Sequence, residues 1–411
     1  MKKALSLYLH FPFCMRKCRY CDFLSFPAEA QARQEYVGRL CREIRIRGQE
    51  FSGHEVQTVF FGGGTPSLLE PEQLSWLMEE IRSSFSLSED AEISLECNPG
   101  TADAEKLFAF RRLGINRLSI GLQSADDREL AMLGRIHTAE QFSECFAAAR
   151  EAGFDNINID LMSGIPGQNI DSLRKTLSAV LKLRPEHLSV YSLIIEEGTP
   201  FWEIYGEDGC TEDVPHCQSC GCSQAEMPPL PDEETEREMV RLNGIPALPD
   251  EETERAMVWL TEEMLRESGY VHYEISNFAL PGYECRHNLV YWRRGEYLGL
   301  GLGAASLIGD MRSRNTSDLE TYLDDCCARE EEETLSRQAQ MEETMFLGLR
   351  CLDGISIREF EARFGQSIFS VYGEVIERYA ELGLLEQHGD RILLSRRGID
   401  VSNQVLADFL L

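Results

Sequence analysis

Three cysteines near the start of the chain have the type and spacing of metal ligands. Cys14, Cys18 and Cys21 lie within eight residues, with three residues between the first pair and two between the second. A structural zinc site normally takes four ligands, and no fourth Cys or His follows at a suitable short spacing. An iron–sulfur cubane also normally takes four cysteines, so three thiolates would leave one iron open to an outside ligand. The triplet therefore predicts a metal site with one open position.

A second group of cysteines lies in the middle of the chain, at Cys210, Cys217, Cys220 and Cys222, with His216 beside it. These side chains are enough to bind zinc or an auxiliary cluster, but their spacing fits no metal motif cleanly. We interpret the group as incidental or weak metal binding, and its role stays open.

The composition excludes several classes of protein. The 411 residues include 70 acidic and 40 basic side chains, for a formal net charge of −30. Nucleic acids and anionic lipids require a basic surface, so neither is expected as the main partner. The sequence has no apolar run near the roughly 18 residues of a membrane-spanning helix, although peripheral membrane contact stays possible. Its start lacks a small-residue cleavage site, which predicts a cytoplasmic protein.

Short runs rich in β-branched and aromatic residues recur along the first half of the chain. They predict six strands, at residues 6–11, 56–61, 92–97, 117–122, 156–161 and 187–193. Amphipathic stretches lie between them, for example at 71–85, 103–114 and 138–153. Strands that alternate with helices six times predict an α/β fold with a parallel sheet, closed fully or partly into a (β/α)6 barrel.

Polar residues occur where these strands end. GGGTPS follows the second strand at 62–67, and Glu96, Gln123 and Asp160 lie at or near the ends of the next three strands. Polar side chains at strand ends can simply face water. Their recurrence beside a cysteine triplet instead favours a site at the carboxyl edge of the sheet.

The sequence predicts four successive segments of the chain. The barrel is expected over 1–202, and an acidic, Cys-rich insertion over 203–247. A near-tandem repeat spans this boundary, because LPDEETEREMVRL at 230–242 recurs as LPDEETERAMVWL at 248–260. A linking helix and a Gly- and Tyr-rich region follow over 248–335. Two helices and a hairpin over 336–411 predict an α+β extension that ends in a winged-helix-like unit, and its acidic balance argues against DNA reading.

The string LYLHFPFCMRKCRYCDF around the triplet resembles the radical S-adenosylmethionine (SAM) proteins. Together with FFGGGTPS at 60–67, it is similar to their coproporphyrinogen dehydrogenase-like family, and most closely to the heme-chaperone branch of that family. The resemblance covers nearly the whole chain except 203–247. It implies a partial barrel of the radical SAM type.

The resemblance also implies cofactors and the residues that hold them. Cys14, Cys18 and Cys21 would bind a [4Fe–4S] cluster whose open iron chelates the amino and carboxylate groups of SAM. Glycine backbone would approach the methionine end closely, a carboxylate would accept hydrogen bonds from the ribose, and an arginine would suit a carboxylate partner. The implied SAM contacts are Tyr8, Tyr20, Gly63, Gly64, Thr65, Glu96, Gln123, Arg135 and Asp160. No catalytic residue is assigned.

Three features favour the heme-chaperone branch over the dehydrogenases. The dehydrogenases carry a further cysteine two residues after the third cluster cysteine, where this chain has Phe23, and a longer segment before the cluster. The string HNLVYW at 287–292 also resembles a heme-binding motif of the chaperone branch.

This motif offers an imidazole for heme iron at His287 and flat apolar rings at Tyr291 and Trp292, with Asn288 between them. Cys285 is a second candidate axial ligand. Alternatively, the His and Asn side chains could hydrogen-bond a turn while the Tyr and Trp rings pack in a core.

We expect a heme chaperone that carries the cluster and SAM and transfers heme to an acceptor protein, with its oligomeric state left open. The alternative is an oxygen-independent coproporphyrinogen III oxidase, which would use radical SAM chemistry to decarboxylate its substrate oxidatively to protoporphyrinogen IX. Whether this chain performs radical chemistry is open. A zinc-binding interaction protein is a third, weaker alternative.

Overall fold

A computed structural model describes residues 2–206 and 246–410. Six parallel strands form the centre of one large sheet and pair in the order in which they follow in the sequence. These strands are β1 (Lys3–Phe11), β2 (His54–Gly63), β3 (Leu87–Cys97), β4 (Arg117–Gln123), β5 (Ile157–Ser163) and β6 (His187–Ser192). All six predicted strands are confirmed, and so is the parallel α/β sheet.

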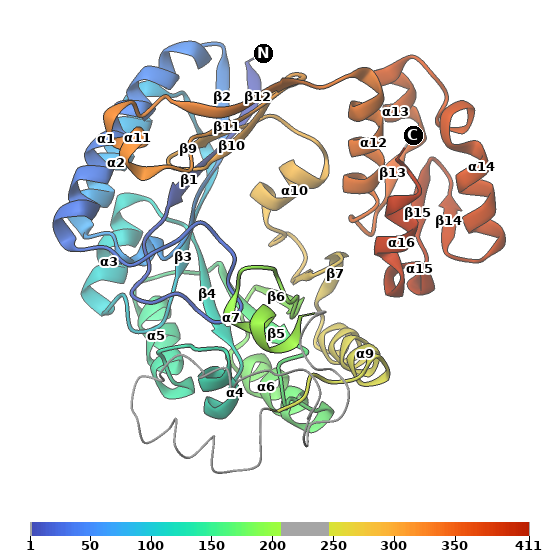
Figure 1. Ribbon diagram of the computed structural model, residues 1–411, viewed down its shortest axis with the longest axis horizontal. Coiled ribbons are helices and arrows are strands. Elements are labelled where there is room, and N and C mark those ends of the chain that lie inside the picture. Colours follow the sequence, from blue (N-terminus) through green and yellow to red (C-terminus); the bar gives the residue numbers. More distant parts are fainter. Residues whose placement is uncertain (1, 207–245, 411) are drawn as a thin grey trace, which may run out of the picture.

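Helices cover the outer face of this curved sheet (Figure 1). They are α1 (Ala30–Gly48), α2 (Pro71–Ser84), α3 (Ala104–Leu113), α5 (Ala139–Glu151) and α6 (Ile170–Leu183). The short helices α4 (Asp127–Met132) and α7 (Pro200–Tyr205) follow β4 and β6, and 3-10 turns lie at Gln49–Phe51 and Pro66–Leu68. The predicted helix ends are confirmed in α3, where Asp103 caps the first turn and Gly114 adopts the left-handed conformation after the last. The apolar faces of the outer helices and the strands form one large core. Met132, Leu133 and Phe201 pack with Met162 and Ile165 in a separate small cluster.

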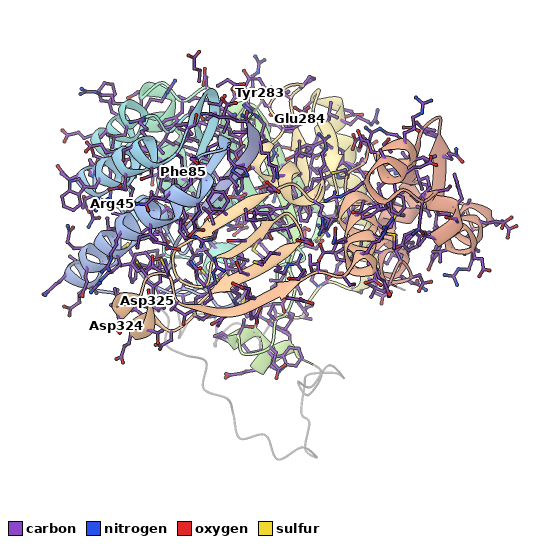
Figure 2. All side chains as sticks on the ribbon, turned by 90° about the horizontal axis from the view of Figure 1, so that it is seen from above. Arg45, Phe85, Tyr283, Glu284, Asp324 and Asp325 are labelled. Carbon is purple, nitrogen blue, oxygen red and sulfur yellow. The ribbon has the colours of Figure 1, made fainter. Side chains whose placement is uncertain are left out.

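The sheet extends beyond both ends of the parallel array. On one side β9 (Tyr297–Leu300) pairs in parallel with β1, and β10 (Ala305–Ile308), β11 (Met311–Asn315) and β12 (Arg329–Thr334) continue it in antiparallel fashion. On the other side β8 (Asn277–Ala279) and β7 (Val271–Glu274) follow β6. Figure 2 shows the antiparallel end beside α1, which carries Arg45, and α11 (Leu319–Asp324). These strands belong to the barrel's sheet, so 248–335 shares the barrel's core.

The first two helices after the undescribed residues 207–245 are α9 and α10. The second copy of the repeat forms α9 (Glu251–Glu267), capped by the Asp250 side chain, which accepts a hydrogen bond from the Thr253 backbone N–H at 2.8 Å. The helix α10 (Arg286–Trp292) lies on the inner side of the curved sheet, between it and the C-terminal unit (Figure 1). The first repeat copy and Cys210, Cys217, Cys220 and Cys222 lie outside the described residues.

The C-terminal unit has a separate apolar core. It contains α12 (Arg337–Gly348), β13 (Ile355–Ser356), α13 (Ile357–Phe364), α14 (Ile368–Glu381), β14 (Leu385–His388), β15 (Arg391–Leu394), α15 (Arg396–Asp400) and α16 (Ser402–Ala407). Its three strands form an antiparallel sheet in the order β13-β15-β14. The helices and hairpin expected after residue 336 are present, and the winged-helix assignment stays a prediction. Within the described residues, no helix combines the length and apolar character needed to cross a bilayer.

Candidate functional site

A cavity of about 350 Å³ opens at the carboxyl ends of the parallel strands. It brings together residues from the β1–α1 loop and from the ends of β2 to β5, as parallel strands dictate. All three cysteines of the triplet and eight of the nine residues expected to contact SAM line it: Cys14, Cys18, Cys21, Tyr20, Gly63, Gly64, Thr65, Glu96, Gln123, Arg135 and Asp160. The ninth, Tyr8, lines an adjacent cavity instead.

The cysteine loop is held in place by backbone and side-chain hydrogen bonds. The Cys14 N–H donates to the carbonyl of Phe26 at 3.1 Å, and the Arg16 guanidinium donates to the carbonyl of Gly134 at 2.7 Å. Hydrogen-bond donors also face two of the thiols, with the Thr65 hydroxyl 3.5 Å from Cys14 Sγ and Arg135 Nη1 3.6 Å from Cys18 Sγ. Such donors can hydrogen-bond the sulfur ligands of an iron–sulfur cluster.

The three thiols line one cavity but do not converge on a position where a single metal ion could bind all of them. All three are free and partly exposed in the cavity. In the part of the chain that the structure describes, no three Cys, His, Asp or Glu side chains converge closely enough to hold one metal ion. A set of thiols that shares a cavity without converging suits a multi-atom cluster better than a single zinc ion.

The glycines at the end of β2 pack closely against the His10 side chain and the Phe13 backbone. A Cβ on Gly63, whose φ is +113°, would lie 2.6 Å from the His10 ring, and a Cβ on Gly64 would lie 2.7 Å from the Phe13 carbonyl oxygen. Both positions therefore require glycine for packing against β1 and the residues just before the cysteine triplet. The same backbone lines the cavity, so its close approach to a ligand stays a prediction.

Arg135 is half-buried beside the cysteine loop, and no carboxylate is among its described hydrogen-bond partners. Its Nη2 donates to Asn98 Oδ1 at 2.6 Å and to the Gly121 carbonyl at 2.9 Å. Its buried Nε has no hydrogen-bond partner among the described residues. An arginine that retains a free donor beside a cavity suits a carboxylate supplied by a ligand.

Glu96 and Asp160 form a pair of half-buried carboxyl groups on the floor of the cavity. Burial, and secondarily the charge of Asp160, raises the pKa of Glu96 to about 8. Burial also raises the pKa of Asp160, although Asp160 accepts hydrogen bonds from Ser119 at 2.9 Å and Asn158 at 2.8 Å. One Glu96 oxygen accepts from the Gly63 N–H at 3.0 Å, which holds the carboxyl group against the β2 turn.

A second cavity of about 180 Å³ lies next to the first and shares Glu96, Ser119, Asp160 and Tyr191 with it. The α10 residues His287, Asn288 and Tyr291 line its other side, together with Tyr8. Three residues of the motif at 287–292 therefore line a cavity that shares four side chains with the cysteine cavity.

His287 is 1% exposed, and both of its ring nitrogens are hydrogen-bonded. Nδ1 lies 2.7 Å from Thr58 Oγ1, and Nε2 lies 2.9 Å from the Tyr291 hydroxyl. Because the Thr58 hydroxyl donates to Ser6, the imidazole donates from Nδ1 and accepts at Nε2. Burial, and secondarily the positive charge of Arg117, lowers the pKa of His287 to about 3. In this arrangement His287 is a neutral, satisfied side chain, and heme ligation stays a prediction that requires one of these bonds to break.

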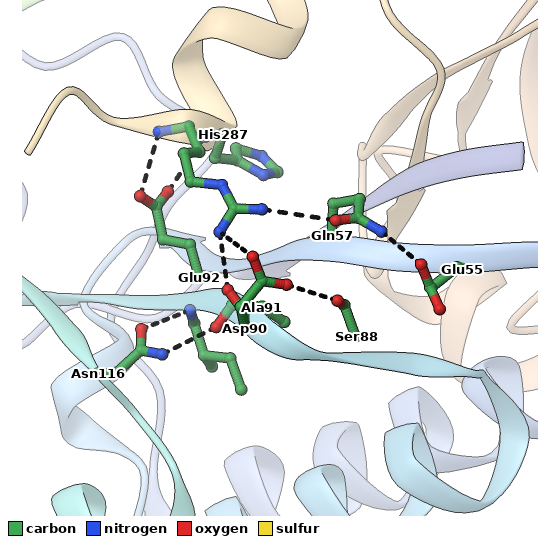
Figure 3. Close-up of polar contacts among 10 residues, drawn as sticks. Glu55, Gln57, Ser88, Asp90, Ala91, Glu92, Asn116 and His287 are labelled. Atoms are coloured by element: carbon green, nitrogen blue, oxygen red, sulfur yellow. Dashed lines mark hydrogen bonds and ion pairs between the residues drawn. The ribbon is translucent and has the colours of Figure 1, made fainter. Parts of the chain in front are cut away.

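Glu92 holds the first turn of α10 in place (Figure 3). One carboxylate oxygen accepts from the Arg286 N–H and the other from the His287 N–H, each at 3.1 Å. The Arg286 side chain also donates to the Asp90 carbonyl at 2.7 Å. The helix therefore gains a carboxylate cap from β3, which the local sequence around α10 lacks.

The other predicted heme contacts are also engaged within the protein. Cys285 is buried, with its Sγ 3.7 Å from Glu92 Oε1, and burial raises its pKa to about 12. The Trp292 ring packs under the Arg350 guanidinium at 4.4 Å. Asn288 and Tyr291 line the second cavity.

Sequence reasoning missed several residues of these cavities. Asn98 connects Arg135 to Thr65, because its Nδ2 donates to Thr65 Oγ1 at 2.9 Å. It follows Glu96 by two positions at the end of β3, a spacing that could have identified it. Arg117 lies at the start of β4 and lines the second cavity, where strand-end reasoning gives no signal.

The Radical SAM superfamily model matches residues 8–180, and the HemN C-terminal domain model matches residues 335–401. Coproporphyrinogen III oxidase (HemN) from Escherichia coli, which is a radical SAM enzyme, has a similar solved structure. The TM-score is 0.79 at 25% identity, over 100% of this chain and 90% of that chain. The fold and the cysteine site thus define a member of the radical SAM superfamily.

Similar proteins of known name identify the family within this superfamily. The heme chaperone HemW of Bacillus subtilis is 34% identical over 98% of this chain and 99% of its own length. HemW of Escherichia coli is 36% identical over 73% of this chain and 69% of its own length. A mitochondrial radical S-adenosyl methionine domain-containing protein of Bos taurus is 31% identical over 98% of this chain and 85% of its own. The chain belongs to the HemW family.

Replacing Glu92 with alanine is expected to loosen α10. The change leaves two backbone N–H groups without their acceptor and should cost about 2 kcal/mol of stability. We expect a lower melting temperature and faster hydrogen exchange at 286–292. Glu89→Ala, an exposed change on the same strand, is the matched control. Unchanged exchange in α10 would contradict this role of Glu92.

Proposed function

We propose that the protein is a heme chaperone that binds a [4Fe–4S] cluster and SAM, and transfers heme to an acceptor protein in the cytoplasm. The observation that carries this proposal is the relationship to HemW of Bacillus subtilis, which extends over 98% of this chain and 99% of the relative. A shared superfamily domain alone would not distinguish carriage from catalysis, whereas similarity across both ends of the chain includes the regions outside the barrel.

Cys14, Cys18 and Cys21 would hold the cluster. The donors from Thr65 and Arg135 near two of the thiols support this assignment. The Arg135 Nε, which has no hydrogen-bond partner among the described residues, and the carboxyl groups of Glu96 and Asp160 would supply polar contacts to SAM. When bound, the cluster and SAM supply one-electron chemistry, while the protein residues orient the cofactor and exclude water.

The heme contacts at Cys285, His287, Asn288, Tyr291 and Trp292 belong to the same proposal. Ligation through His287 would require its bond to Thr58 or to Tyr291 to break, since these two groups occupy both ring nitrogens. Cys285 would likewise have to leave Glu92. Either ligand would then act in a second conformation of the chain.

The second candidate is oxygen-independent coproporphyrinogen III oxidation. The TM-score of 0.79 to the Escherichia coli oxidase favours it, because the two chains share their architecture over nearly their whole length. Fold similarity at 25% identity supports a common scaffold and leaves the reaction to the residues of the site.

A paired experiment separates the two functions. The protein is reconstituted anaerobically and given heme in one sample and coproporphyrinogen III in another, with a reductant and SAM. We expect heme binding in the absorption spectrum and no protoporphyrinogen IX. Conversion of the porphyrinogen together with weak heme binding would reject the chaperone proposal.

Cluster iron is expected to depend on the cysteine triplet alone. Single serine variants of Cys14, Cys18 and Cys21 should each lose most of the bound iron, because a cluster held by three thiolates cannot spare one. The matched control replaces Cys210, Cys217, Cys220 and Cys222 together and should retain the iron of the parent. Iron and zinc are measured by elemental analysis, and a clear loss of metal from the fourfold variant would overturn this division.

SAM binding should depend on pH through Glu96. Ribose hydroxyls donate to a carboxylate, so binding favours the ionised form of a group whose pKa is about 8. Affinity should therefore rise as pH increases toward 8, by up to about tenfold per pH unit, with release of a proton, and level off above that.

Calorimetry in two buffers of different ionisation enthalpy measures both the affinity and the proton release. Glu96→Gln should remove the pH dependence, while Glu89→Gln on the same strand should retain it. A pH dependence that persists in Glu96→Gln would assign the titration to another group.

A further inference from the structure

The opening of the cysteine cavity is lined by exposed apolar side chains. Met15, Phe23, Ile136 and Tyr191, which we name the pocket mouth, all line this cavity. Their exposed fractions are 58%, 64%, 47% and 40%. Large apolar side chains that gather at one opening while exposed to solvent mark a site for an apolar ligand or partner.

The pocket mouth is built from three separate segments. Met15 and Phe23 lie on the cysteine loop, Ile136 follows Arg135 between α4 and α5, and Tyr191 lies near the end of β6. The Arg16 side chain links two of these segments through its bond to the Gly134 carbonyl. The side chains are therefore arranged around the opening by the fold and are not neighbours in one flexible segment.

The floor of the same cavity is polar. Glu96, Asn98, Arg135 and Asp160 line it, and these are the groups suited to hold SAM. A ligand at the mouth would thus meet apolar surface on one side and the SAM site beneath. This division separates a polar cofactor from a larger apolar ligand within one cavity.

Positive charge lies beside the mouth, in a chain whose formal net charge is −30. Arg16 and Lys17 are on the loop between Met15 and Phe23, and Lys17 is exposed. Heme is a flat apolar macrocycle with two propionate groups. Its ring matches the apolar side chains, and its propionates match the two cations.

We propose that the pocket mouth is the surface on which heme is received, with the macrocycle on Phe23 and Ile136 and the propionates toward Arg16 and Lys17. This inference rests on the proposed chaperone function and assigns its ligand to a surface. The mouth is open in the arrangement described, whereas His287 is 1% exposed and fully hydrogen-bonded.

The test uses the full-length, cluster-reconstituted protein and titration with heme. The double variant Phe23→Asp/Ile136→Asp should weaken heme binding at least about tenfold, because two apolar contacts become charged. The matched control Phe108→Asp/Ile46→Asp changes the same residue types at exposed positions of α3 and α1 and should bind like the parent. Iron content and melting temperature verify that both variants fold.

A second measurement needs no variant. Hydrogen exchange of the parent protein, with and without heme, should show protection at 15–23 and 134–137. Protection confined to 286–292, or parent-like affinity in the mouth variant, would overturn the inference while leaving the chaperone function intact. Failure of the parent itself to bind heme would instead reject the chaperone function.

Discussion

The burial of charged side chains inside the partial barrel constrains much of the rest of the structure. Arg117 and Glu92 are both buried on the inner side of the sheet, and Asp160 lines the same cavity as Arg117. Removing such groups from water is costly unless opposite charges and hydrogen-bond donors surround them. Glu92 meets this requirement through the backbone of α10, and Asp160 through Ser119 and Asn158. The position of α10 is thus coupled to the charges of the sheet.

The same constraint joins the two cavities. Glu96 and Asp160 contribute to both, so a ligand that changes the charge of this pair changes the field at His287 and Tyr8 as well. Burial raises the pKa of both carboxyl groups, which means that one proton can be held at the floor near neutral pH. A cofactor held at the proposed SAM site would therefore be linked to the α10 motif through side chains that line both cavities.

The parallel strands were predictable because strands buried on both faces appear as short apolar runs, and their polar ends identified the cavity. The same strand-end pattern could also have predicted Asn98. It could not have predicted Arg117, since a charged residue at the start of a strand usually faces water. The burial of α10 and the pairing of β9 with β1 depend on contacts between distant segments, which local patterns do not encode. Tyr8 lines the second cavity, next to the cysteine cavity, and its contact with SAM stays a prediction.

A carrier must release what it binds, and this requirement favours an open surface over an enclosed pocket. A macrocycle resting on the pocket mouth would have one face on Phe23 and Ile136 and the other in solvent, where an acceptor can contact it. Affinity differences between related complexes arise mainly from their dissociation rates, which fall as more of a ligand is enclosed. Ligation by the buried His287 of α10 would enclose the heme more fully, and the heme would then dissociate more slowly. A site on the mouth explains how one cavity could keep a polar cofactor on its floor while an apolar ligand passes over it.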